Sequence, residues 1–141
     1  ACPGPTAESA TETRGKDTLM DFSFSEEQQA VSDLAAQILG DQSTNEALKA
    51  HEATGEPYPA GLWSALADAG LLGIALPEDV GGSGLGFLEA CLTLEQIGRT
   101  TAPVPYFATV MAALAVNQFG SDEQRQVFTV ALGLALRGLA E

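Results

Sequence analysis

The stretch LWSALADAGLLGIALPEDVGGSGLG, residues 62–86, places four kinds of local sequence in a definite order, and that order decides the fold. An apolar helical segment ends at Gly70, a short apolar segment covers Leu71 to Leu76, an acidic turn begins at Pro77, and a glycine-rich loop follows. We expect the short apolar segment to be extended, because it is too short for a surface helix. The glycines are interpreted as a structural turn between two helices, since they lack the spacing and the following Gly-Lys-Ser/Thr of phosphate-binding loops.

Two helices and the start of a third are expected before this stretch. Ser25 and Gln28 have the spacing of a capping box, in which each side chain binds the other residue's backbone at a helix N-terminus. Apolar residues recur behind them at helical spacing, so we expect a helix that ends at Gly40. A polar, peripheral helix is expected over about residues 44–53, and Pro59 suits the first turn of the next helix.

Three more helices are expected after it. Residues 85–97 are apolar on more than one side, which is typical of a central helix, and we expect Gly98 to end it. Residues 104–119 form the next expected helix. A second capping-box sequence over residues 121–124 indicates another helix, which is expected to end at Gly133.

These elements predict an all-α fold, an orthogonal and irregular bundle of five to six helices with a short strand-like tail at the C-terminus. We expect residues 1–19 to be a disordered leader or upstream sequence, residues 20–133 to form the helical domain, and residues 134–141 to be the truncated start of a following β domain. The expected core consists of apolar positions on the inner faces of these helices: Leu34, Ile38, Trp63, Leu66, Leu88, Leu92, Val110, Leu114 and Phe128.

Composition and charge limit the classes of partner. The chain has 141 residues, a formal net charge of −13 and no basic run, so binding to nucleic acid or to an anionic membrane surface is not expected. The uncharged residues 102–120 are interrupted by prolines and polar residues, and their apolar core is shorter than the ~20 residues of a membrane span. Cys2 and Cys91 lack disulfide-framework and metal-ligand spacing, so we expect a reducing, cytoplasmic compartment, no metal site, and a buried free thiol at Cys91.

Few residues qualify for chemistry by pattern alone. His51, the only histidine, lies in the expected polar helix and is interpreted as a solvated surface residue. Glu78 and Asp79 are adjacent in a turn, so their side chains point apart and are interpreted as surface acids. Trp63 is interpreted as a core residue of a helical stripe. No catalytic residue follows from these patterns.

Four segments in a fixed order carry a resemblance to a known family: FSEEQ at 24–28, the stretch 62–86, LEQIGR at 94–99, and GSDEQR at 120–125. Over about residues 22–141 the chain resembles the N-terminal helical domain of the acyl-CoA dehydrogenases. In that family a β-barrel-like middle domain and a four-helix C-terminal domain follow. FAD lies largely between these two, and a catalytic glutamate outside the N-terminal domain removes the substrate's α-proton. The resemblance implies the N-terminal part of such an enzyme, with no catalytic residue in this chain.

The resemblance also implies where an acyl-CoA substrate lies. The start of the helix expected at 104–119 lines the far end of the fatty-acyl pocket in the family, which places Pro103, Val104 and Phe107 near the substrate tail. Bulky or kinked residues there would set the chain length of the substrate. Fatty-acyl, branched-chain and steroid side-chain thioesters all stay open.

The cofactor expected from the resemblance is FAD. Arg137, Leu139 and Ala140 resemble the opening of the family's flavin-contacting motif. Ala140 stands where the family usually has a hydroxyl residue, and the Gly-Ser-Asp turn that follows in the family does not occur here. We therefore do not expect this chain alone to hold FAD, which is assigned to the full-length protein.

Three functions stay open at this point. The chain is the N-terminal part of a dehydrogenase, a non-catalytic helical module that docks onto a dehydrogenase partner, or an inactive truncated fragment. The whole protein is expected to be a homo- or hetero-oligomer. For the truncated fragment we expect an exposed apolar patch, because in the family these helices pack against later domains.

Overall fold

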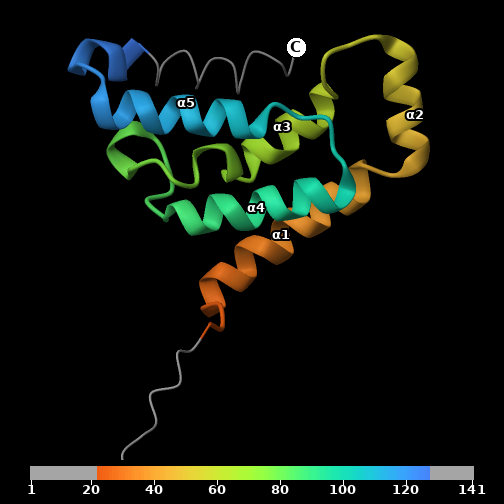
Figure 1. Ribbon diagram of the computed structural model, residues 1–141, viewed down its shortest axis with the longest axis horizontal. Coiled ribbons are helices and arrows are strands. Elements are labelled where there is room, and N and C mark those ends of the chain that lie inside the picture. Colours follow the sequence, from red (N-terminus) through yellow and green to blue (C-terminus); the bar gives the residue numbers. More distant parts are fainter. Residues whose placement is uncertain (1–21, 128–141) are drawn as a thin grey trace, which may run out of the picture.

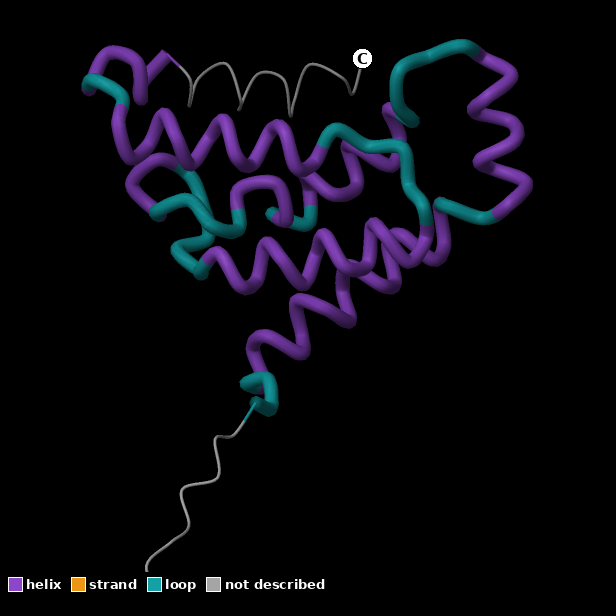
Figure 2. Tube along the Cα trace, viewed as in Figure 1, coloured by secondary structure: helices purple, strands orange, loops and turns teal. Residues whose placement is uncertain are grey.

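The computed structural model describes residues 22–127, and all structural statements below concern that range. Within it the expected all-α fold is confirmed, because helices and loops alone make up the chain (Figure 2). The expected leader at 1–19 and the strand-like tail at 134–141 lie outside the described residues. Residues 122–127 are also helical. The labelled α-helices are α1 (Glu26–Gln42), α2 (Asn45–Thr54), α3 (Ala60–Asp68), α4 (Phe87–Thr100) and α5 (Tyr106–Phe119). Two short 3₁₀ helices, η1 (Leu71–Gly73) and η2 (Glu78–Val80), lie between α3 and α4.

The helices stack in layers (Figure 1). α5 lies over α3 and η1, and α4 lies on the opposite side of them, where it crosses α1. The most extensive contact between two elements is that of α1 with α4. α2 stands apart at one end of the molecule, and none of its residues is buried. The polar, peripheral helix expected from the sequence is therefore present.

The core lies between α1, α3, η1, α4 and α5. Of the residues expected there, Trp63, Leu66, Leu92 and Val110 are buried, and Ile38 and Leu114 are half-buried against the core. Leu34 and Leu88 were also expected in the core, and this is wrong because both are exposed. α1 buries Ala35 and Leu39, which leaves Leu34 at the edge of its contact face, and Leu88 lies in the first turn of α4 beside the equally exposed Phe87. The last expected core residue, Phe128, lies outside the described range.

The apolar segment expected to be extended is instead a tight turn. Residues 71–73 form η1, and burial falls on Leu71, Leu72, Ile74 and Leu76. A 3₁₀ turn can bury consecutive side chains, whereas the alternating side chains of a strand need two apolar surfaces. Gly70 makes the entry possible, because its φ of 74° lies in the left-handed region.

The glycine-rich loop is a structural turn, as expected. The N–H groups of Gly82, Ser83, Gly84 and Leu85 donate to backbone carbonyls of residues 73–77, at 2.9–3.1 Å. A Cβ atom at Gly82 would collide with the backbone carbonyl of Leu76. The loop therefore packs directly on the preceding turn, and these four donors are not available to a phosphate group.

Several helix ends differ from expectation. α1 continues past Gly40 to Gln42, and α4 continues past Gly98 to Thr100, because neither glycine adopts a positive φ. The expected start of the helix at 104 is early by two residues, since α5 begins at Tyr106, after Pro105. Both capping boxes are present, with Gln28 N–H donating to Ser25 Oγ at 3.2 Å and Gln124 N–H donating to Ser121 Oγ at 3.3 Å.

One buried carboxylate joins the N-termini of α1 and α4. Glu89 Oε2 accepts from the Gly86 N–H at 2.8 Å, and its Oε1 accepts from Gln28 Nε2 at 3.0 Å. Gln28 Oε1 in turn accepts from the Ser25 N–H, so the two helix caps form one connected network. The hydrogen bond from Gln28, aided by the backbone N–H groups of Glu89 and Gly86, lowers the pKa of Glu89 against the opposing effect of burial.

This network predicts an acid-sensitive stabilisation. Because the folded-state pKa of Glu89 is lowered, its contribution is present above the ordinary glutamate pKa of 4.5 and is lost as the pH falls through the folded-state value. The variant Glu89→Gln should lower the free energy of unfolding at pH 7 by about 1 kcal/mol, because one part-buried donor loses its charged acceptor. The difference from wild type should shrink below pH 4.5.

Urea unfolding of both proteins at several pH values measures this difference. Glu95→Gln is the control, since Glu95 lies on the same helix and makes an exposed ion pair with Arg99 at 2.9 Å, which contributes little. The account is contradicted if Glu89→Gln lowers the free energy of unfolding no more than Glu95→Gln does. It is also contradicted if the loss in Glu89→Gln is unchanged at about pH 3, well below the ordinary glutamate pKa.

Candidate functional site

The connection between α4 and α5 is built by an unusual helix end. Thr101 adopts φ 51°, the one positive φ at a non-glycine residue in the described part of the chain. Its N–H donates to the Gly98 carbonyl at 3.3 Å, and the Ala102 N–H donates to the Ile97 carbonyl at 3.2 Å, the pair of bonds of a Schellman motif. A β-branched residue in this conformation is strained. The chain therefore leaves α4 abruptly and carries residues 102–105 across to α5.

Tyr106 fixes the first turn of α5 on the core. Its ring is fully buried, and its hydroxyl donates to the Leu71 carbonyl of η1 at 3.0 Å. Burial raises the pKa of Tyr106 to about 12, with a smaller contribution in the same direction from Cys91, so the hydroxyl stays a neutral donor. Cys91 is a free thiol, as expected, but it is only half-buried.

The three residues expected near a substrate tail lie together at this position. Pro103 is exposed in the α4–α5 connection, and Val104 is half-buried against the core. Phe107 begins α5 beside Tyr106 and is 60% exposed. The three residues are thus close in sequence at the start of α5, but they differ in exposure, since Val104 packs against the core while Pro103 and Phe107 are exposed.

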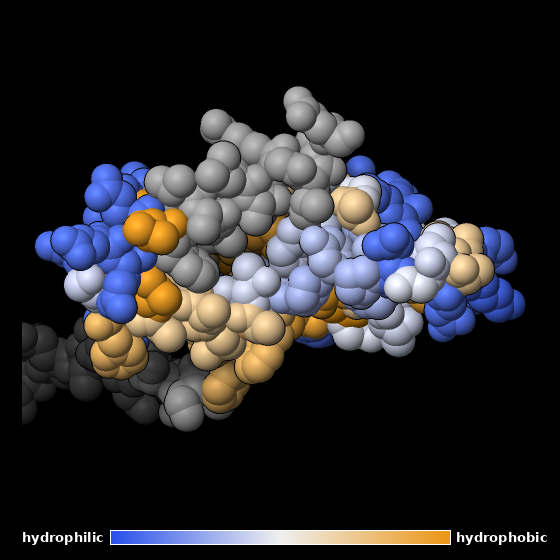
Figure 3. Space-filling model, turned by 90° about the horizontal axis from the view of Figure 1, so that it is seen from above, coloured by the Kyte–Doolittle hydropathy of each residue, from blue (hydrophilic) through white to orange (hydrophobic). Residues whose placement is uncertain are grey.

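An apolar stripe continues from Phe107 along the outside of α5. We define it as Phe107, Met111, Ala115 and Phe119, four exposed residues that recur every four positions. No residue of α5 is charged, although the chain carries a net charge of −13. In the view from above, apolar residues lie next to the hydrophilic residues at one end of the molecule, and paler residues lie between them and the hydrophilic other end (Figure 3). The stripe ends at a hollow of about 720 Å³ that Phe119, Glu123 and Val127 help to line.

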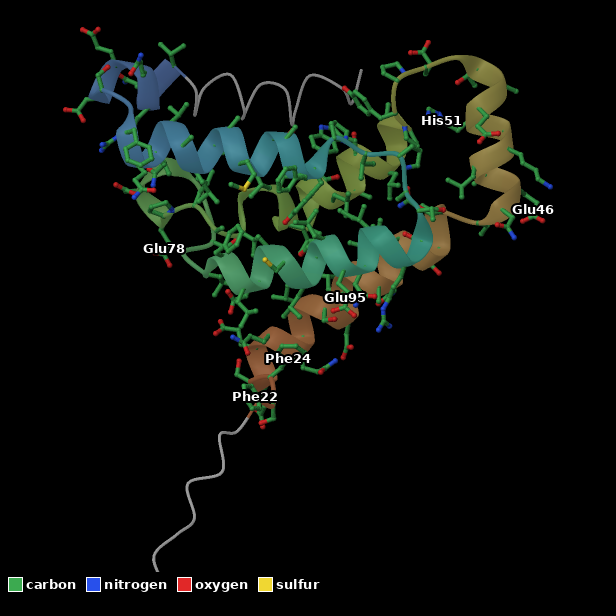
Figure 4. All side chains as sticks on the ribbon, viewed as in Figure 1. Phe22, Phe24, Glu46, His51, Glu78 and Glu95 are labelled. Carbon is green, nitrogen blue, oxygen red and sulfur yellow. The ribbon has the colours of Figure 1, made fainter. Side chains whose placement is uncertain are left out.

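A second hollow, of about 430 Å³, lies between α2 and the α4–α5 connection. His51 and Glu52 line it from α2, and Pro103 lines it from the connection. His51, which was expected to be a solvated surface residue, is half-buried beside this hollow. In Figure 4 it lies on the side of α2 that faces the rest of the molecule, whereas Glu46 lies at the outer end of that helix. Sequence reasoning missed this hollow, because the two segments that form it are about fifty residues apart.

The described residues include few basic side chains that could bind the pyrophosphate of a flavin cofactor. Their basic side chains are Lys49, Arg99 and Arg125, and the two arginines pair with acids on their own helices. These positions do not converge on one point that could hold a pyrophosphate. The expected flavin-contacting residues Arg137, Leu139 and Ala140 lie outside the described range. Within residues 22–127 no group of acids, histidines and cysteines could hold a metal ion.

Comparisons with known proteins agree on one family. A sequence model described as the acyl-CoA dehydrogenase N-terminal domain matches residues 25–132. Over 108 residues the chain is 37% identical to the acyl-CoA dehydrogenase FadE27 of Mycobacterium tuberculosis, covering 76% of this chain and 29% of that protein. Over 108 residues it is 31% identical to the mitochondrial isovaleryl-CoA dehydrogenase of Solanum tuberosum, covering 74% of this chain and 26% of that protein.

Two solved structures share the fold. The ChsE4-ChsE5 complex from Mycobacterium tuberculosis matches with a TM-score of 0.75 and 36% identity, covering 84% of this chain and 32% of the matched one. A variant of the Tcur3481-Tcur3483 steroid ACAD matches with a TM-score of 0.70 and 45% identity, covering 74% and 29%. The chain thus spans 26–32% of the length of these relatives. Among the described helices, none is long and apolar enough to span a membrane.

The Tyr106 hydroxyl gives a direct test of how α5 is held. Tyr106→Phe should lower the free energy of unfolding by about 1–2 kcal/mol, because the buried Leu71 carbonyl loses its donor. Tyr58→Phe is the matched control, since Tyr58 is only half-buried and its ring contacts Trp63. Urea unfolding measures both variants, and equal losses would contradict an anchoring role for the Tyr106 hydroxyl.

The strained Thr101 predicts the opposite effect. Thr101→Gly should raise the free energy of unfolding by about 1 kcal/mol, because glycine adopts a left-handed backbone without the steric cost of a β-branched side chain. Thr100→Gly, one residue earlier in regular helix, should lower it. Thermal unfolding of the two variants should therefore show changes of opposite sign, and a loss of stability in Thr101→Gly would disprove the strain.

Proposed function

Because this chain belongs to the acyl-CoA dehydrogenase family, we propose that it forms the N-terminal helical domain of an FAD-dependent enzyme that oxidises acyl-CoA thioesters between their α and β carbons. The family match over residues 25–132 is the observation that carries the proposal. Bound FAD would accept the hydride from the β-carbon. This chain covers only 29% and 26% of the two enzymes it was compared with, so the flavin and the catalytic base are assigned to parts outside it.

The role of this chain in that reaction is to bind and enclose the acyl tail. Pro103, Val104 and Phe107 form an apolar corner at the start of α5. A hydrocarbon tail packed on this corner loses contact with water, and burial of an aromatic side chain contributes about 1.5–3 kcal/mol. The absence of charge on α5 keeps this wall apolar along its whole length. We assign tail binding to these three residues.

The rest of the apolar stripe is assigned to packing against further protein. Phe119, which is 80% exposed, lies about three turns from Phe107, roughly 18 Å along the helix. A contiguous exposed patch of this kind marks a contact with another domain or chain. The partner surface belongs either to the same protein or to another subunit of a homo- or hetero-oligomer, in a reducing, cytoplasmic setting. Contact of Arg137, Leu139 and Ala140 with FAD stays a prediction.

A non-catalytic module that docks onto a dehydrogenase partner is the second candidate. It is favoured by the two solved structures, since each carries the names of two proteins, ChsE4 with ChsE5 and Tcur3481 with Tcur3483. Both candidates use the stripe as an interface. They differ in whether the protein that contains this chain holds flavin and turns over substrate itself.

Flavin reduction by the whole protein that carries this domain distinguishes the two. The enzyme reading predicts that an acyl-CoA bleaches the flavin absorbance and is converted to a 2-enoyl-CoA. If the purified whole protein binds no flavin, yet forms a stable complex with a separate flavin-containing dehydrogenase chain, the non-catalytic reading is correct.

Two matched variants test the assignment of the tail-binding corner. Phe107→Ala should move the acyl-chain preference of the whole enzyme toward bulkier tails, with kcat/KM for the preferred substrate reduced about 10- to 150-fold, because the tail loses an aromatic contact worth about 1.5–3 kcal/mol. Phe119→Ala makes the same chemical change on the same stripe, away from the corner, and should leave the preference unchanged. Assays over a series of acyl chain lengths compare them. Identical profiles for the two variants would refute a tail-binding role for Phe107.

A further inference from the structure

The hollow of about 430 Å³ beside α2 is not used by the function proposed so far. Its volume lies within the range of about 300–1,000 Å³ found for small-molecule pockets. α2 has no buried residue and makes only sparse contacts with the other elements, so the side chains of the domain do not fill this space. α2, which forms one wall of the hollow, lies apart from the other helices (Figure 4).

The hollow touches the tail-binding corner at one residue. Pro103 lines the hollow and also belongs to the corner formed with Val104 and Phe107. A tail that follows the corner past Pro103 therefore enters the space in front of α2. Leu48 and Pro57 add apolar surface to its walls.

The charged residues that line the hollow are negative. Glu52 and Glu56 line the hollow, and neither takes part in the ion pairs found among residues 22–127. His51 adds an imidazole that can donate or accept one hydrogen bond when neutral. Two carboxylates accept hydrogen bonds and repel anions, so the lining disfavours a carboxylate and favours a group that donates a hydrogen bond.

We propose that this hollow receives the distal end of the acyl tail and selects tails that end in an uncharged, hydroxyl-bearing group over tails that end in a carboxylate. The proposal rests on the proposed function, because Pro103 connects the hollow to the tail-binding corner. Glu52 and Glu56 are its specificity-determining residues, and His51 is a hydrogen-bonding partner of the terminal hydroxyl.

Three long acyl-CoA thioesters of equal chain length test this selection in the whole enzyme. One ends in a methyl group, one in an ω-hydroxyl group and one in an ω-carboxylate. We expect kcat/KM to be highest for the ω-hydroxyl substrate and at least about tenfold lower for the ω-carboxylate. The double variant Glu52→Gln with Glu56→Gln should recover about tenfold of the ω-carboxylate value, because both removed charges repel an anion in the hollow.

Glu46→Gln is the matched control, since Glu46 lies on α2 away from the hollow and removes the same charge. It should leave the order and the ratios of the three substrates unchanged. His51→Leu should lower kcat/KM for the ω-hydroxyl substrate toward that of the methyl-ended one. Thermal unfolding of each variant confirms that the fold is kept.

A binding measurement that needs no turnover completes the test. A non-oxidisable thioether analogue of the ω-hydroxyacyl-CoA should slow hydrogen exchange in residues 48–57, and a four-carbon analogue should not. Equal kcat/KM for the three substrates together with unchanged exchange overturns the selection proposal and leaves the proposed function standing. Failure of every acyl-CoA to reduce the flavin overturns the proposed function and this inference with it.

Discussion

The hydrogen bond from the buried Tyr106 hydroxyl to the Leu71 carbonyl is the constraint on which the functional surface depends. It fixes the first turn of α5 on the turn that follows α3, so α5 has one possible rotation about its axis. Consecutive residues of a helix point about 100° apart. With Tyr106 turned into the core, Phe107 must point outward, and so must the residues that follow it at intervals of four. One buried ring therefore sets the position of the whole apolar stripe.

The distribution of charge also separates the apolar surface of α5 from the rest of the chain. A chain with a net charge of −13 has an uncharged α5, and its buried carboxylate Glu89 serves to join two helix caps. No described residue combines a nucleophile or general base with a partner that would activate it. In the proposed function, the domain would contribute the shape and polarity of a surface, and the reacting groups would lie elsewhere in the whole protein.

Much of this fold follows from local sequence rules. Ser25 with Gln28 and Ser121 with Gln124 specify capping boxes by spacing alone, and both form as expected. The glycines of residues 81–86 specify a turn, because Gly82 must lie against the Leu76 carbonyl. The helix ends near Gly40 and Gly98 were not predictable in this way. A glycine ends a helix only where the backbone turns left-handed, and at the end of α4 tertiary packing assigns that conformation to Thr101.

The candidate site was predictable in part. The tail-binding role of Pro103, Val104 and Phe107 came from the resemblance to the family and stays a prediction; in the structure Pro103 and Phe107 are exposed and Val104 is half-buried. The hollow beside His51 depends on how far α2 stands from the α4–α5 connection, a distance that no pattern within either segment encodes. Leu34 and Leu88 were misplaced for a related reason: helical periodicity marks an apolar face but not which edge of it a neighbouring helix covers.

The central claim is that the start of α5 touches the acyl tail. Photolabelling of the whole protein with an acyl-CoA that carries a diazirine at the end of its tail tests this claim most directly. The account predicts adducts within residues 103–107 that excess unlabelled acyl-CoA suppresses. Specific adducts found only outside residues 22–127 would contradict it.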